Sequence, residues 1–125
     1  MYRITKSFTF DASHQLLSLP DGHKCKRLHG HTYKTTIELR SESLDEHGFV
    51  MDFGELDSIK TYLDTVFDHR HLNSVMPLLE PTAENIAKFL FDMFRKLLGE
   101  RGNLLYAVTI NETPKTSATY YEKSK

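Results

Sequence analysis

Apolar and polar residues alternate over residues 2–11, with Lys6 as the one interruption on the apolar side. Successive side chains of a β-strand point to opposite faces, so this period of two predicts a half-buried strand. The same alternation over residues 29–40 predicts a second strand. The sequence Leu-Pro-Asp-Gly at 19–22 marks a turn within the loop that joins the two strands, residues 15–28.

Two segments in the middle of the chain have apolar residues every three or four positions, which is the spacing of one helix face. The first covers residues 52–67, and Asp52 is placed to cap its start. The second begins after Thr82, a residue type favoured at the N-cap, and ends near Gly99. We therefore expect two consecutive amphipathic helices.

Alternation returns in residues 104–112 and 116–122, which predicts two further strands and the order ββααββ. We expect a single α+β domain over residues 1–125, with a four-stranded antiparallel sheet and both helices on one face. Such a sheet has open edges, and open edges are usually paired or covered. An oligomer that joins sheets edge to edge would satisfy them.

Composition narrows the class of partner. Sixteen Lys and Arg against 17 Asp and Glu give a net charge of −1, so we expect neither a nucleic acid nor a membrane as partner. A single cysteine allows no intrachain disulfide and suits a reducing compartment. Neither a signal peptide nor a span of about 18 apolar residues is evident. We expect a cytoplasmic protein that binds a small molecule.

The residues best suited to chemistry are concentrated between Cys25 and His31. On a strand, His29 and His31 would point to the same face, roughly 6–7 Å apart at Cα. A catalytic zinc ion takes three protein ligands and keeps one position open, and His14, at the end of the first strand, is the candidate for the third ligand. Cys25 as a fourth ligand would instead make a closed structural site, and this alternative stays open.

Two acidic residues outside this stretch are further candidates. Glu112 shares the strand parity of Val108 and Ile110, so its carboxylate should point inward at the end of the strand. A buried carboxylate is costly unless it is paired, and a ligand rich in donors would compensate it. Asp68 is next to His69 in sequence, which does not prove that they touch, and His69 could be an ordinary loop histidine.

A set of motifs ties these residues together: Phe10-x-x-x-His14, Gly22-His23-Lys24-Cys25-x-x-x-His29-Gly30-His31, Met51-Asp52-Phe53, Asp68-His69-x-x-Leu72-Asn73, Pro81-Thr82-x-Glu84-Asn85 and Glu112-Thr113. Their order and spacing resemble the 6-pyruvoyltetrahydropterin synthase family from about residue 4 to residue 121. The spacing between Cys25 and His29 is similar to the bacterial subgroup that forms 6-carboxy-5,6,7,8-tetrahydropterin in queuosine biosynthesis. Ser13, where alanine is common, and Phe67, where leucine is common, depart from the pattern.

The resemblance implies a tunnelling fold, in which three subunits close a barrel and two trimers stack into a homohexamer. It implies that His14, His29 and His31 bind Zn²⁺. It also implies that Cys25 is the general base of a group completed by the catalytic residues Asp68 and His69. Glu112 would bind the substrate by accepting hydrogen bonds from the pterin ring.

The implied reaction is that of a zinc-dependent lyase. It converts 7,8-dihydroneopterin triphosphate to 6-carboxy-5,6,7,8-tetrahydropterin and releases triphosphate and acetaldehyde. Because the net charge is near zero, local groups such as Lys24, Lys26 and Arg27 would have to receive the triphosphate. One alternative is a pyruvoyl-type synthase that keeps the side chain, which the Cys25–His29 spacing disfavours. The other is a non-catalytic, zinc-stabilised binding module, which has no need of an inward glutamate or an Asp-His pair.

Overall fold

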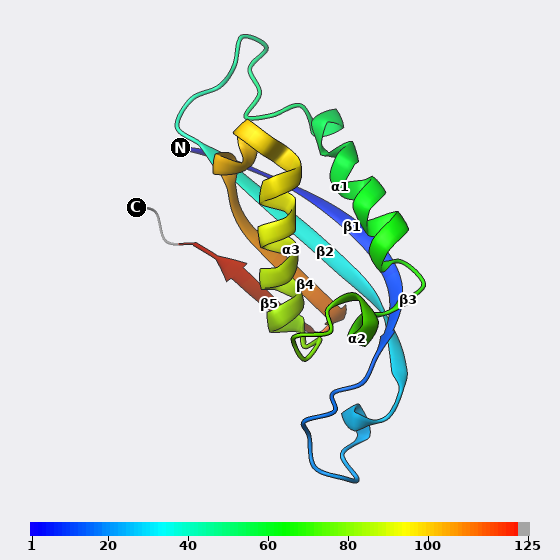
Figure 1. The fold of residues 1–125 in the computed structure, drawn as a ribbon. Coiled ribbons are helices and arrows are strands. Elements are labelled where there is room, and N and C mark those ends of the chain that lie inside the picture. Colours follow the sequence, from blue (N-terminus) through cyan, green and yellow to red (C-terminus); the bar gives the residue numbers. More distant parts are fainter. Residues whose placement is uncertain (123–125) are drawn as a thin grey trace.

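In the computed structural model, which describes residues 1–122, a single sheet carries the helices on one face (Figure 1). The strands are β1 (Tyr2–His14), β2 (His29–Ser41), β3 (Arg70–His71), β4 (Leu105–Thr113) and β5 (Thr116–Tyr121). The α-helices are α1 (Asp57–Tyr62), α2 (Leu72–Val75) and α3 (Ala83–Leu98). The strand order across the sheet is β3-β1-β2-β4-β5.

The expected four-stranded antiparallel sheet is wrong in one respect, because β3 adds a fifth strand that runs parallel to β1. This strand comprises Arg70 and His71 alone, so it is too short to show the alternation by which strands are predicted. The other neighbouring strands pair antiparallel, as expected. The α+β class is confirmed and the sheet is mixed, while closure of a barrel by several chains stays a prediction.

The first expected helix forms as three short segments in succession. A 3-10 turn over Phe53–Leu56 leads into α1, and a π-helical turn over Leu63–Phe67 ends it. Asp52 caps the start, where its carboxylate accepts a hydrogen bond from the Gly54 backbone at 2.9 Å. This run covers the predicted residues, but the helical geometry changes along it.

The second expected helix, α3, has the predicted ends. Thr82 is its N-cap, and its hydroxyl accepts a hydrogen bond from the Asn85 backbone at 3.1 Å. Gly99 follows the last turn with a φ of 59°, a backbone conformation that glycine adopts without steric cost. The apolar side of α3 packs on the sheet through residues such as Phe91 and Phe94, which are fully buried.

The hydrophobic core lies between the helices and the near face of the sheet, and it runs directly into the histidines. The rings of Phe10 on β1 and Tyr33 on β2 stack 5.0 Å apart. Tyr33 then lies 5.9 Å from the ring of His14 and 5.4 Å from that of His31, measured between centroids. His14 is only 1% exposed. The fold therefore places polar rings at the end of an otherwise apolar layer.

The far face of the sheet is polar. Hydroxyl pairs cross it, including Ser7 with Thr36 at 2.9 Å and Thr109 with Thr119 at 2.7 Å. None of the helices in residues 1–122 is both long enough and apolar enough to span a membrane.

Candidate metal and substrate site

The pairing of β1 with β2 assembles the histidine cluster. Their register runs from Tyr2 opposite Ser41 to His14 opposite His29, and Ala12 is opposite His31. Because His14, His29 and His31 occupy the core face at this end, one ring nitrogen from each comes within 4.8 Å of the others. The Nε2 atoms of His14 and His29 are only 2.9 Å apart.

Backbone carbonyls fix the orientation of two of these rings. His14 Nδ1 lies 2.8 Å from the carbonyl oxygen of Pro81, and His29 Nδ1 lies 2.7 Å from that of Arg27. A carbonyl oxygen only accepts hydrogen bonds, so both Nδ1 atoms carry the proton and both Nε2 atoms present a lone pair in the neutral rings. Carbonyl partners of this kind typically orient histidines that bind metal.

Burial keeps two of the rings in the form that binds a cation. Burial lowers the pKa of His14, and the hydrogen bond to the Pro81 carbonyl raises it by less. Burial also lowers the pKa of His31, and the negative charge of Glu112 raises it by less. His31 Nε2 is buried and has no hydrogen-bond partner among residues 1–122. A buried nitrogen without a partner is costly. The three imidazoles can therefore hold one metal ion.

Glu112, near the end of β4, lies beside the cluster. Its Oε2 atom is 3.9 Å from His31 Nε2, and its side chain is 26% exposed. It also lines a hollow of about 240 Å³ with Ala83, Glu84, Thr116, Ser117 and Ala118. Two carboxylates beside one small hollow favour a ligand that presents N–H donors.

Asp68 and His69 form a pair at the other side of β1. His69 Nδ1 lies 2.9 Å from Asp68 Oδ2, and Asp68 Oδ1 accepts a hydrogen bond from the Asp11 backbone at 2.9 Å. The pKa of His69 is raised, chiefly by the hydrogen bond to Asp68. The pKa of Asp68 is lowered, first by the Asp11 hydrogen bond and then by His69. Asp68 thus holds the His69 ring at Nδ1, and no hydrogen bond engages Nε2 within residues 1–122.

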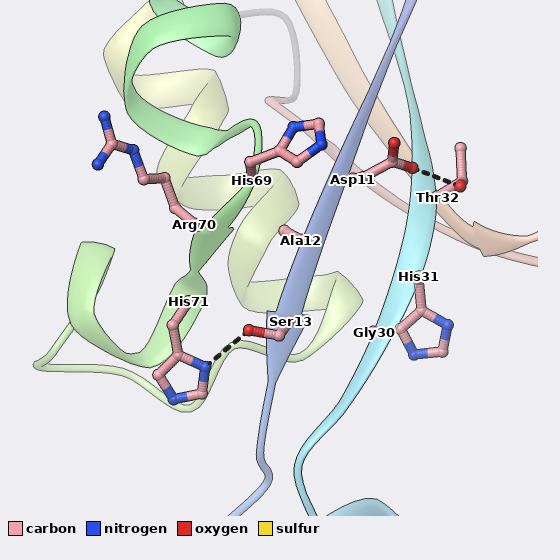
Figure 2. Close-up of a pocket in the computed structure, with 9 residues that line it drawn as sticks. All are labelled: Asp11, Ala12, Ser13, Gly30, His31, Thr32, His69, Arg70 and His71. Atoms are coloured by element: carbon pink, nitrogen blue, oxygen red, sulfur yellow. Dashed lines mark hydrogen bonds between the residues drawn. The ribbon is translucent and has the colours of Figure 1, made fainter.

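His69, but not Asp68, lines a broad pocket of about 670 Å³ (Figure 2). Its walls come from β1, β2 and β3, and β1 lies between His69 and His71 on one side and His31 on the other. Among the described residues, His31 is therefore the one member of the histidine cluster that the pocket touches.

Cys25 lies in the loop between β1 and β2, in a 3-10 turn over Lys24–Lys26. It is partly buried, and its backbone oxygen accepts a hydrogen bond from Leu16 at 2.9 Å. The thiol is not among the grouped metal ligands found in residues 1–122, and it makes no hydrogen bond to Asp68 or His69 there. One chain therefore does not bring Cys25 together with the Asp68–His69 pair.

The basic residues proposed for the triphosphate share the same loop. Lys26 is already paired with Asp21, at 2.5 Å between Nζ and Oδ1. Lys24 and Arg27 are exposed.

Sequence patterns missed several groups that support the site. The carbonyls of Pro81 and Arg27 orient two imidazoles. Every residue has a backbone carbonyl, so the residue type does not indicate such a contact. The backbone N–H of Asp11 positions Asp68, and this contact likewise cannot be predicted from the type of residue. The proline before the cap of α3 was the only available signal, and it does not reveal a contact with His14.

Comparisons with known proteins agree with this geometry. Residues 3–123 match the family model of 6-pyruvoyl tetrahydropterin synthase, so the chain belongs to that family. The chain is 37% identical to a 6-carboxy-5,6,7,8-tetrahydropterin synthase of Synechocystis, over 97% of this chain and 94% of the relative. It is 32% identical to the protein of the same name from Haemophilus influenzae, over 98% and 100%.

The fold gives the same family. The solved structure of Caenorhabditis elegans 6-pyruvoyl tetrahydropterin synthase superimposes with a TM-score of 0.87 at 30% sequence identity, over 98% of this chain and 96% of that one. The resemblance seen in the motifs is thereby confirmed at the level of the family.

Proposed function

We propose that this protein is a zinc-dependent lyase that converts 7,8-dihydroneopterin triphosphate and water to 6-carboxy-5,6,7,8-tetrahydropterin, triphosphate and acetaldehyde, in queuosine biosynthesis. The observation that carries the proposal is the convergence of three imidazole nitrogens within 4.8 Å. The names of the Synechocystis and Haemophilus influenzae relatives support the choice of product.

The donor set suits zinc. Two nitrogens bound tetrahedrally to one zinc ion at about 2.0–2.1 Å lie roughly 3.4 Å apart. That separation falls between the 2.9 Å of the His14–His29 pair and the 4.8 Å that bounds the cluster. When bound, zinc would supply Lewis acidity to the side-chain oxygens of the substrate and so acidify the neighbouring C–H bonds.

The residues of the chain then have separate roles. Glu112 binds the pterin ring by accepting hydrogen bonds from its N–H groups. Cys25, as thiolate, takes a proton from the substrate side chain. His69, with Nδ1 held by Asp68, carries a proton at Nε2.

An oligomer is part of the proposal. In one chain, Cys25 makes no hydrogen bond with Asp68 or His69 among residues 1–122, so a neighbouring chain would be needed to complete the group. The open edges at β3 and β5 offer backbone groups for such contacts. We propose a homohexamer built as a dimer of trimers, and light scattering of the purified protein tests its mass.

Incubation with 7,8-dihydroneopterin triphosphate tests the reaction. Mass spectrometry should find 6-carboxytetrahydropterin and triphosphate, and a trapping reagent should capture acetaldehyde. The second candidate is triphosphate elimination without side-chain cleavage, which the similarity to the Caenorhabditis elegans enzyme favours. A pyruvoyl pterin without acetaldehyde would establish that second candidate instead.

A further inference from the structure

The shortest strand of the sheet joins its neighbour through one bond between side chains. In β3, Arg70 pairs with Ala12 and His71 pairs with Ser13. Across this junction, Ser13 Oγ and His71 Nδ1 are hydrogen-bonded at 3.0 Å and partly buried (Figure 2). Two residues of parallel pairing provide few backbone hydrogen bonds, so side-chain bonds add to the attachment. Within β3 this is the Ser13–His71 bond, and just past β3 the amide of Asn73 bonds the backbone of Gln15 at 2.9 and 2.8 Å.

The residue that enters β3 has an unusual backbone. His69 has a φ of 59°, and it is the one residue other than glycine with a positive φ in residues 1–122. That conformation costs free energy for a residue with a Cβ, so it persists only where neighbouring contacts impose it. Here the backbone N–H of His69 donates to the carbonyl of Asp11 at 2.6 Å, immediately before the β1 residues that receive β3.

The two features are linked along the chain. His71 fixes the far end of β3 on β1, while Asp11 holds its near end through Asp68 and His69. If the far end moved, the left-handed turn could relax, and the imidazole of His69 would leave Asp68. The core anchors the segment on either side through Phe67 and Leu72, which are fully buried. It does not hold the ring of His69, whose side chain is 78% exposed.

We propose that the Ser13–His71 hydrogen bond positions the His69 imidazole against Asp68 by fixing β3 on β1. Ser13 and His71 are positioning residues, and of these three residues only His69 meets the substrate. The effect on turnover rests on the proposed function. The effect on the ring of His69 does not, because it is a property of the free protein.

The test follows the imidazole of His69 by NMR titration of protein with labelled histidines, assigned through His69→Gln. The variants are Ser13→Ala, which removes the hydroxyl, and Ser13→Thr, which keeps it. Ser7→Ala is the matched control, because it removes a similar bond, to Thr36, from the same strand. The groups that face this ring are Asp11, Asp68, Arg70 and His71, and all four are kept in the three variants.

We expect Ser13→Ala to bring the pKa of His69 back toward its ordinary value, while Ser13→Thr and Ser7→Ala leave it raised. Zinc content and circular dichroism should be unchanged. With active enzyme, Ser13→Ala should lower kcat by about tenfold to a hundredfold with little change in KM, the scale of a misplaced catalytic group.

An unchanged His69 titration in Ser13→Ala would overturn the proposal, whatever the turnover. A His71→Phe variant that loses far more activity than Ser13→Ala would also overturn it, by assigning His71 to the substrate. Absence of turnover in the unmodified protein would count against the proposed function. The titration of His69 would still test the positioning role of Ser13 and His71.

Discussion

The Nε2 atoms of His14 and His29 lie 2.9 Å apart, and the other nitrogen of each ring donates to a backbone carbonyl. Two neutral imidazoles fixed in this way present lone pairs to each other, which is unfavourable unless a cation lies between them. Burial lowers the pKa of His14, so a proton is a poor candidate for that cation. A metal ion is the better one.

Removing a ligand should therefore release the metal. In His29→Ala and His31→Ala, zinc affinity should fall by more than the roughly 10–100-fold typical of losing an outer-shell partner. Plasma mass spectrometry of the purified variants measures this. His47→Ala is the control, since that side chain is 69% exposed and outside the cluster. Full zinc retention in both variants would show that His29 and His31 are not zinc ligands.

Cys25→Ala should keep its zinc and its oligomeric state but lose turnover. The reason is that the thiol is outside the histidine cluster in the described chain, so it is free to act on the substrate. Because the sequence has one cysteine, iodoacetamide can modify only this thiol and should abolish turnover in the unmodified protein. Loss of zinc from Cys25→Ala would instead support the closed four-ligand site.

Glu112→Gln should weaken pterin binding by about 1.5–3 kcal/mol, because an amide replaces one acceptor oxygen with a donor. This corresponds to a roughly 10- to 150-fold rise in Kd. Fluorescence titration with neopterin measures it. Glu46→Gln is the control, since the side chain of Glu46 is 86% exposed and lies outside this hollow. Equal affinities in unmodified protein and Glu112→Gln would rule out the anchor role.

The pKa of His69 should lie above 6.5, because Asp68 stabilises the imidazolium by a hydrogen bond and by charge. A pKa that folding raises adds stability that is complete below the unfolded value and disappears as the pH rises through the folded value. Asp68→Asn should lower the pKa toward 6.5, and Asp92→Asn, which removes a distant carboxylate, should not. NMR titration distinguishes them, and a pKa unaffected by Asp68→Asn contradicts the pairing.

Thr82→Ala should lower the free energy of unfolding by about 1 kcal/mol, because the N-cap of α3 loses its hydroxyl acceptor. Thr82→Ser keeps an oxygen in the same place and should retain most of that stability. Urea denaturation of both variants measures the difference. Equal midpoints for the alanine and serine variants would show that the cap contributes nothing.

The sequence predicted those parts of the fold that repeat over many residues. Alternation located β1 and β2, and the cap at Thr82 with the stop at Gly99 located α3. It missed β3, whose two residues are held by contacts with β1 that lie far away in sequence. The period of two also placed His29 and His31 on one face, which is a local property of a strand.

Long-range geometry was beyond such patterns. No periodicity reports that Pro81 and Arg27 orient the imidazoles, because the groups involved are carbonyls common to every residue. The Cys25 thiol makes no hydrogen bond to Asp68 within residues 1–122, and this depends on the path of the loop between β1 and β2, which the sequence motifs do not reveal.

The pairing of His14 with His29 also closes the loop of residues 15–28 at its base. An ion bound by both residues would act as a reversible cross-link between the two ends of that loop. The cross-link would lower the conformational entropy that the loop gains when its ends separate from the sheet. Removal of the ion should let the hairpin fray from this end first, with faster amide exchange at Ala12 and His31 than at Ile4 and Leu39. The position of Cys25, whose backbone accepts a hydrogen bond from Leu16 near the base of the loop, would then depend on metal occupancy even though its thiol is outside the histidine cluster.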